Sequence, residues 1–250
     1  MIDAYIASKL LDCTHDDGKS EKIKQTFPDF SVVERLSYKN EAIEVYVAIN
    51  PVDKLMVVLF PLPTISLLQQ LIFTTQSRTE FVGSVVNQSI LNFIHPAFDD
   101  LKILVTLRRG HQLTYIGEGM GGAFAELLAL YMPPSQLFTF GQYQAVYQYR
   151  KRGHDFRCER WFATSHHKLP TFNPIPEFQF GDVFLTAADQ TVSVLPHDAN
   201  QAAQATNKAV YRDYFSVLGP PPRRSGYYHL MIEHWSLWRA HHPEYKQSIH

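Results

Sequence analysis

The amino-acid sequence predicts an α/β fold in which a mostly parallel central sheet is flanked by helices, as a three-layer sandwich. The first observation is strand-like patterning over residues 31–62, where three runs rich in Val, Ile, Leu and Tyr are separated by turn residues. The second is the order strand, helix, strand over residues 112–141. Two strands joined by a helix of this length form a right-handed parallel crossover, the repeating unit of an α/β sheet.

The composition is that of a globular protein and limits the choice of partners. The chain has 250 residues, of which 45% are apolar and 19% charged. This is enough for one full core, and we expect a single domain over residues 1–250. Lys and Arg number 23 against 24 Asp and Glu, so the net charge is −1. A chain without positive excess attracts polyanions weakly, so we expect no nucleic-acid partner. We also expect no cofactor.

Cysteine and histidine usage argues against a disulfide framework and a metal site. Cys13 and Cys158 are the two cysteines, and their spacing matches no metal-ligand pair. Adjacent histidines at 166–167 and 241–242 lack an accompanying zinc motif. The N-terminal stretch has charged residues where a signal peptide is apolar, and no run approaches the roughly 18 apolar residues of a membrane span. We therefore expect a soluble cytoplasmic protein without a metal, while signal-independent export is compatible with the same sequence.

The first 107 residues divide into helix, strand and helix segments. Helical spacing of apolar residues predicts a helix over residues 2–12, and a polar loop follows at 14–22. Strands are predicted at 31–38, 41–49 and 54–62: the first two form a hairpin, and the third, apolar on both faces, is a central buried strand. Helices are predicted at 64–73 and 88–107. The long helix has one apolar packing face: Ile90, Phe93, Ile94, Phe98, Leu101, Leu104 and Leu107.

The second part of the chain begins with the strand and helix on either side of a glycine-rich turn. A strand at 112–117 leads into a helix at 123–132, which Pro133 and Pro134 stop, and a further strand follows at 136–141. The last third is less regular. Its predicted strands are 158–164, 178–186 and 191–196, and its predicted helices are 200–215 and 228–241.

The glycine-rich turn has the pattern that serine hydrolases use for their nucleophile. It reads Gly117-Glu118-Gly119-Met120-Gly121-Gly122. In the G-x-S-x-G elbow, small flanking residues let strand and helix approach, and the central serine adopts a strained backbone conformation. Here the flanking glycines are present, but position 119 is glycine, and no other stretch has the pattern. The turn also lacks the G-x-G-x-x-G spacing of a dinucleotide-binding loop.

Three motifs in order resemble the class 3 (fungal-type) lipases. The elbow of that family typically reads GHSLGGALA, and GEGMGGAFA at residues 117–125 is similar to it. The family's H-x-G-F corresponds to His95-Pro96-Ala97-Phe98, and its TFG strand end to Thr139-Phe140-Gly141. The resemblance covers roughly residues 54–142. It implies an α/β-hydrolase fold and a site for ester hydrolysis of lipids.

The chain departs from this family at each part of the catalytic machinery. The family has A-F-R-G-T after its third strand, where this chain has Leu59-Phe60-Pro61-Leu62-Pro63, and proline lacks the N–H donor that an oxyanion requires. The family's aspartate motif aligns with Arg160…His167-Lys168-Leu169-Pro170, which puts His167 in the position of the acid. Asp182 and Asp189 are alternative acids, although neither falls on the motif. For the family's histidine, His229 is preferred over His234.

The resemblance also indicates which side chains would contact a ligand. Phe60, Leu62, Met120 and Tyr143 are the expected ligand-binding residues. Glu118, beside the missing nucleophile, is a possible acid or base if burial raises its pKa, although an ion pair is the more frequent role of such a residue.

Together the residues predict a lipase-like pseudoenzyme. Its degenerate triad positions are Gly119, His167 and His229, and it would act by binding a protein partner or a lipid-like ligand. One alternative is a lipase or carboxylesterase in which glycine has replaced the natural serine at position 119. Another is a repurposed pocket that carries out a non-hydrolytic isomerisation or cyclisation with His229 and Glu118.

Overall fold

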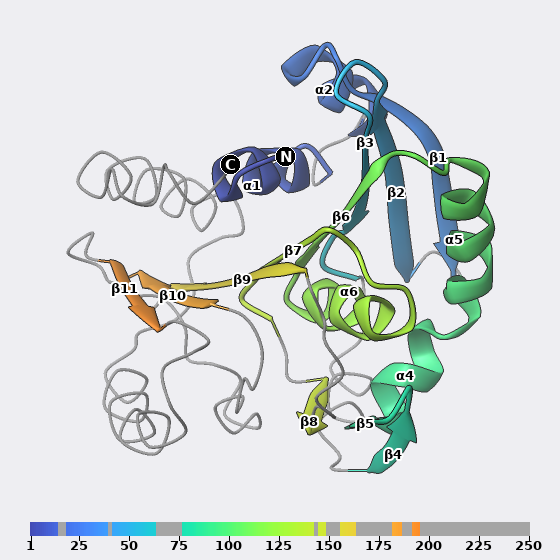
Figure 1. The fold of residues 1–250 in the computed structure, drawn as a ribbon, viewed down its shortest axis with the longest axis vertical. Coiled ribbons are helices and arrows are strands. Elements are labelled where there is room, and N and C mark those ends of the chain that lie inside the picture. Colours follow the sequence, from blue (N-terminus) through green and yellow to red (C-terminus); the bar gives the residue numbers. More distant parts are fainter. Residues whose placement is uncertain are drawn as a thin grey trace.

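A computed structural model describes residues 1–14, 19–39, 42–63, 77–142, 145–148, 156–163, 182–186 and 192–195 (Figure 1). Within these residues, a sheet of eight strands has the order β1-β2-β3-β6-β7-β9-β10-β11. The strands have the following bounds: β1 Ser31–Tyr38, β2 Ile43–Asn50, β3 Leu55–Phe60, β6 Gln112–Glu118, β7 Gln136–Phe140, β9 Arg157–Ala163, β10 Asp182–Thr186 and β11 Val192–Leu195. The sheet is therefore continuous across segments that are far apart in the sequence.

Strand directions confirm the predicted α/β fold. Strands β3, β6, β7, β9 and β10 pair parallel to one another. Antiparallel pairing is confined to the two sides of the sheet, where β1 pairs with β2, β2 with β3, and β10 with β11. The first two strands form the predicted hairpin, and all six residues of β3 are buried, as expected for a central strand. The crossover from β6 to β7 passes through helix α6 (Met120–Tyr131) and joins parallel strands. This is an α/β-hydrolase-like arrangement.

Two hydrophobic cores lie on the two faces of the sheet. Because side chains alternate along a strand, Val58 and Tyr115 face one core while Val57 and Ile116 face the other. Helix α1 (Ala4–Asp12) packs on the second face. Helices α4 (Gln88–Ile94), α5 (Pro96–Leu107) and α6 pack on the opposite face, the one that carries Val58 and Tyr115. Figure 1 shows α1 and α6 on opposite sides of the strands between them. The predicted three layers are thus present.

The long helix predicted over residues 88–107 is wrong, because the segment forms two helices. Helix α4 ends at Ile94 and α5 begins at Pro96. Proline has no N–H for a helix interior but suits a first helical position, so it ends one helix and starts the next. The predicted single packing face also fails at its end, since Leu107 is 73% exposed. Leu101 is fully buried as predicted.

The polar loop predicted at residues 14–22 is partly wrong. Helix α2 (Lys19–Thr26) occupies its second half, and burial of Ile23 against the α1 core fixes this helix in place. At the N-terminus, α1 begins two residues later than predicted. The Asp3 side chain caps it by accepting a hydrogen bond from the Ile6 N–H at 2.9 Å.

A second, three-stranded sheet was not predicted. It consists of β4 (Arg78–Phe81), β5 (Ser84–Asn87) and β8 (Val146–Gln148) in the order β4-β5-β8, all antiparallel. The turn between β4 and β5 has positive φ at Val82 and Gly83, which is the conformation of a two-residue hairpin turn. Val-Gly is not among the dipeptides that predict such a turn, so the sequence contains no signal for it. These strands have three or four residues each, too few for a periodic signal.

Several predicted elements lie outside the described residues. They are the helices at 64–73, 200–215 and 228–241 and the first four residues of the strand at 178–186. The strands predicted at 158–164 and 191–196 correspond to β9 and β11. In the part of the chain with described structure, no helix is both long and apolar enough to cross a membrane.

Candidate functional site

The turn between β6 and α6 has the backbone geometry of a nucleophile elbow. Strand β6 ends at Glu118, α6 begins at Met120, and Gly119 alone makes the reversal with φ 52° and ψ −117°. A positive φ of this kind is accessible to glycine without the steric cost that a side chain brings. The Gly119 N–H donates to the carbonyl of Phe140 at 2.8 Å, which ties the turn to the end of β7.

The neighbouring glycines are required by close contact between backbones. A Cβ atom on Gly117 would lie 2.4 Å from the carbonyl oxygen of Gly121. A Cβ atom on Gly121 would lie 2.1 Å from the carbonyl oxygen of Phe60, at the end of β3. No side chain fits at such distances, because both carbonyl oxygens belong to the backbone and cannot rotate away. The glycines therefore let α6 lie directly on β6 and against the end of β3.

The position at the centre of the elbow has no reactive group of its own. Gly119 carries no hydroxyl or thiol, so the atom that attacks a carbonyl carbon in serine hydrolases has no counterpart there. The adjacent Glu118 is 8% exposed and is paired in register with Phe140, which is paired with Trp161. Residues in register share a face of the sheet, so Glu118 lies on the α1 face with these two aromatic residues.

The residues after β3 contact the elbow from the side of the neighbouring strand. Pro61 and Pro63 are buried and lack backbone N–H groups, and Leu62 between them is half-buried. A Cβ atom on Gly121 would also lie 2.6 Å from the carbonyl oxygen of Pro61, so this segment directly contacts the start of α6. The backbone here presents carbonyl oxygens and few donors, the opposite of what stabilises an oxyanion.

The predicted ligand contacts differ in their exposure. The Phe60 ring is fully buried and packs edge-to-face on Tyr115, with ring centroids 6.5 Å apart. Met120 is also buried, and both residues belong to the core on the α6 face. Leu62 is the one partly accessible residue of this predicted set that the structure describes. Tyr143 lies outside the described residues.

The predicted triad partners of position 119 cannot be placed against it. His167, His229 and His234 all lie outside the described residues, and their roles stay predictions. Of the segment aligned with the family's aspartate motif, Arg160 is described, on β9. The structure therefore positions the elbow and the turn after β3 together, and leaves the histidines as assignments from sequence.

A buried polar network beside the elbow was missed from the sequence. Arg160 donates from Nη2 to Oε1 of Glu126 at 2.6 Å and from Nη1 to the side-chain oxygen of Gln142. The Gln142 amide nitrogen donates to the other oxygen of Glu126. All three side chains are at most 3% exposed. The network joins α6, the residues after β7 and β9, three elements that meet around the elbow.

A signal for this network was present in the α6 sequence. Glu126 is the single charged residue in the otherwise apolar run AFAELLALY at 123–131. A carboxylate at such a position is buried, and a buried carboxylate requires a cationic partner. What the sequence does not reveal is which arginine of the chain supplies it.

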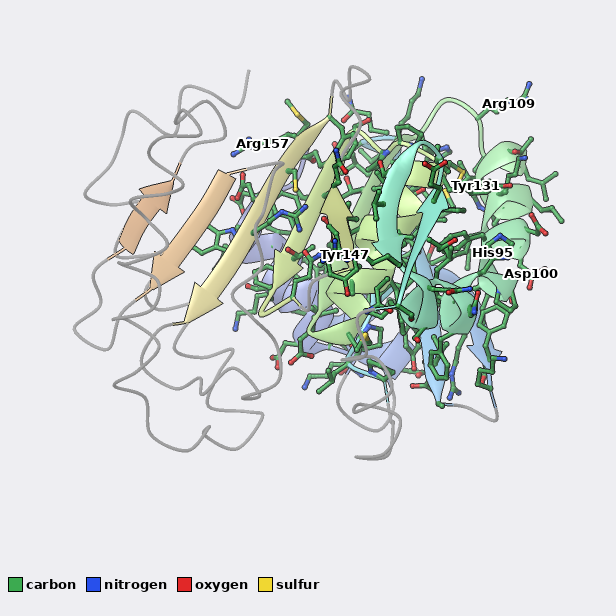
Figure 2. All side chains as sticks on the ribbon, turned by 90° about the horizontal axis from the view of Figure 1, so that it is seen from below. His95, Asp100, Arg109, Tyr131, Tyr147 and Arg157 are labelled. Carbon is green, nitrogen blue, oxygen red and sulfur yellow. The ribbon has the colours of Figure 1, made fainter. Side chains whose placement is uncertain are left out.

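His95, the first residue of the motif aligned with H-x-G-F, lies at the junction of α4 and α5 (Figure 2). It is exposed, and its ring packs on Phe98 and Phe81, with centroids 5.6 and 6.2 Å apart. Phe98 also stacks on Tyr131 at the end of α6, at 5.6 Å. The motif thus connects the small sheet, α5 and α6 by aromatic packing.

Metal-ligand groups and cysteine thiols can be checked directly in the described part of the chain. Within it, no group of three or more His, Cys, Asp or Glu side chains is arranged to hold a metal ion. Cys13 and Cys158 are buried and do not form a disulfide. Burial raises the pKa of the Cys13 thiol, which keeps it in the unreactive protonated form. Burial also raises the pKa of Tyr115, whose hydroxyl donates to the Met132 carbonyl at 3.0 Å.

Comparison with solved structures finds fungal lipases with the same arrangement. A triacylglyceride lipase from Rhizomucor miehei matches with a TM-score of 0.60 and 15% identity, over 81% of this chain and 86% of that one. Lipase II from Rhizopus niveus matches with a TM-score of 0.56 and 16% identity, over 77% and 81%. What they share is the fold. No protein-family model and no curated protein sequence matches the chain.

Proposed function

We propose that this chain is a lipase-fold binding protein without serine-dependent ester hydrolysis. The observation that carries the proposal is the elbow: its backbone has the conformation that presents a nucleophile, and the residue there is Gly119. Strand, turn and helix are retained together with the glycines that allow their contact, while the reactive atom is missing. A scaffold kept in this form without its nucleophile is suited to binding.

The expected loss of activity is large. Removing the serine of a triad costs on the order of 10⁶ in kcat, and on the order of 10³ to 10⁴ over water remains from the oxyanion hole and substrate binding. Pro61 and Pro63 have no N–H groups to donate to an oxyanion, so that remainder is also reduced. The alignment of His167 with the orienting acid removes a third contribution.

A lipid-like molecule is the ligand class that we propose first, with a protein partner as the second. The similar solved structures are named as lipases of triacylglycerol substrates, and a site derived from such a fold would bind an acyl chain or ester. Leu62 is the accessible apolar residue at the turn after β3 that would contact it. The proposal includes a cytoplasmic location.

The test of lost hydrolysis is labelling with a fluorophosphonate probe together with turnover of short and long p-nitrophenyl esters. We expect no labelling and no turnover for the wild-type chain. The matched variant is Gly119→Ser, which restores the hydroxyl and nothing else, and we expect it to stay inactive because the prolines and His167 are unchanged. Robust esterase activity of Gly119→Ser would contradict the proposal and favour a hydrolase in which glycine has replaced the natural serine.

Binding is tested by native mass spectrometry of the chain purified from the cells that produce it. We expect a co-purified lipid-sized mass that is lost on transfer to denaturing conditions. A co-purified polypeptide in its place would favour the protein-partner form of the proposal. Substituting Leu62→Gln should reduce the lipid-bound fraction, with Leu36→Gln, a half-buried leucine on β1, as the control.

A further inference from the structure

Two apolar side chains are exposed near the N-terminal ends of strands β3 and β6, which lie opposite the elbow. Val52 is 78% exposed and Leu107 is 73% exposed, the highest values among the large apolar residues that the structure describes. Val52 lies in the turn between β2 and β3, and Leu107 ends α5 just before β6. Single exposed apolar side chains are common on protein surfaces, and a contact surface requires further features beside them.

The two loops are held next to each other by a backbone hydrogen bond. The Gln112 N–H at the start of β6 donates to the Lys54 carbonyl before β3, at 2.7 Å. Strands β3 and β6 are parallel and paired from this point onward, so the loops that precede them emerge at the same edge. In Figure 1 both loops lie on the upper side, and the two strands run from there toward the start of α6.

The same loops carry an excess of positive charge. Lys54, Arg108 and Arg109 belong to residues 51–54 and 108–111, and the acidic residue within those loops is Asp53. Figure 2 shows Arg109 on the loop that joins α5 to β6. The chain as a whole has a net charge of −1, so this concentration of cations is local. The charges along helix α5 also place the cations at this end, because Asp99 lies in its first turn and Arg108 and Arg109 follow its last residue.

The apolar residues are presented by ordered backbone. The Asn50 side-chain oxygen accepts hydrogen bonds from the N–H groups of Val52 and Asp53, both at 3.0 Å. Its amide nitrogen donates to the Asp53 carboxylate, also at 3.0 Å. On α5, Ile103 lies one turn before Leu107 and is 59% exposed, which extends the apolar stripe on the outer face of the helix.

From these observations we infer that residues 51–54 together with the C-terminal end of α5 and its following loop form a docking surface for an anionic phospholipid bilayer. Apolar side chains enter the interface between headgroups and acyl chains, while Lys and Arg remain at the level of the phosphates. Charge complementarity favours this occupant. A symmetric contact between two copies would bring the same cations together and is opposed by their repulsion.

The docking surface is distinct from the site of the proposed function, because the two lie at opposite ends of the parallel strands. Bilayer docking therefore requires no occupied acyl site. A chain that fails to bind vesicles would leave the proposed function intact, and a chain that hydrolyses esters would leave the docking surface intact.

The test is flotation of the full chain with vesicles of phosphatidylcholine alone and of phosphatidylcholine mixed with phosphatidylserine. We expect binding to the mixed vesicles that weakens as salt is raised, because screening shortens the reach of the charges. Flotation independent of phosphatidylserine, or absent with both vesicle types, would overturn the inference.

Lys54 and Lys39 offer a matched pair of charge variants. Both are exposed lysines with φ 52°, and strand β2 separates them, so one lies at the docking surface and the other at the opposite end of the sheet. Lys54→Glu should lower the partition coefficient about thirtyfold, since each basic residue near an anionic surface contributes about fivefold and reversal counts twice. Lys39→Glu should leave it unchanged, and equal loss in the two variants would refute the assignment.

Leu107 and Val82 offer a second pair of variants, which tests the apolar contribution to vesicle binding. Leu107→Ser should reduce binding about tenfold through the lost burial of a leucine, while Val82→Ser, at an exposed valine of the β4–β5 turn, should not. The melting temperature of each variant shows whether lost binding is caused by unfolding. Lys54→Arg keeps the positive charge and should retain vesicle binding. If sedimentation velocity shows a dimer that Leu107→Ser dissociates, the surface is a contact between copies, and the bilayer assignment is wrong.

Discussion

The two ends of strand β6 both carry glycines, and the glycines are there for different reasons. At the C-terminal end, a Cβ atom on Gly117 or Gly121 would collide with backbone at 2.4 and 2.1 Å. At the other end, Gly110 in the loop before β6 has φ 98°, and a Cβ atom there would meet nothing within 4 Å. The first end is constrained by contact and the second only by conformation.

The C-terminal end of β6 therefore belongs to the packed interior, while the loop and helix before β6 have exposed side chains that are available for contacts. Helix α6, which follows the elbow, buries almost every residue, whereas α5 before β6 leaves Ile103 and Leu107 exposed. The packing of α6 depends on the shape of the elbow, because Gly117 and Gly121 bring the backbones of β6, α6 and β3 into contact. Substitutions at the two ends should therefore differ most in stability.

The largest effect is expected for Gly121→Ala. Its methyl group would lie 2.1 Å from the Phe60 carbonyl oxygen, and relief requires α6 to move off the sheet. We expect a loss of more than about 4 kcal/mol in the free energy of unfolding, measured by chemical denaturation followed by circular dichroism. Gly121→Ala with a melting curve close to wild type would show that the contact at the elbow does not constrain this end of β6.

The next effect concerns the buried network beside the elbow. Arg160→Leu leaves the Glu126 carboxylate buried without its cation and should cost about 3 to 5 kcal/mol. The double variant Glu126→Leu with Arg160→Leu should recover part of this loss in the same unfolding assay. As a contrast, Arg35→Ala at the exposed pair with Glu44 should cost less than about 1 kcal/mol, because Arg35 is 53% exposed. Equal costs at the two pairs would contradict the network's role.

Gly119→Ser should have an intermediate effect. A serine held at φ 52° and ψ −117° stores backbone strain of about 1 to 3 kcal/mol. For a chain of this size each kcal/mol lowers the melting temperature by about 2 to 4 °C. Differential scanning calorimetry of the variant measures this shift. A variant more stable than wild type would mean that the turn relaxes to a conformation other than the elbow.

The smallest effect is expected at the open end of β6. Gly110→Ala meets no neighbouring atom and pays only for its positive φ, about 1 kcal/mol. Chemical denaturation of Gly110→Ala beside Gly121→Ala makes the comparison direct. Should the two alanine variants lose the same stability, conformation and not contact would limit both ends.

Local sequence predicted the elements whose signal is periodic. The strands near residues 31, 43 and 55 and the β6-α6-β7 crossover match the prediction, because alternation, apolar runs and proline stops are properties of neighbouring residues. The single helix over 88–107 was wrong, although Pro96 was visible in it. Helix α2 was missed because Ile23 is the single buried apolar residue among its described side chains, and a polar helix with one buried residue has no periodic pattern.

For the candidate site, residues 117–122 were sufficient to predict an elbow without a serine after β6, since both the glycine pattern and the missing serine can be seen in them. The folded chain was needed to see why those glycines are required, that Arg160 pairs with Glu126, and that Val52 and Leu107 are exposed beside paired strand ends. The reason is physical. Backbone collision, ion pairing and shared exposure join atoms from separate segments, and their distances exist only once the sheet has formed.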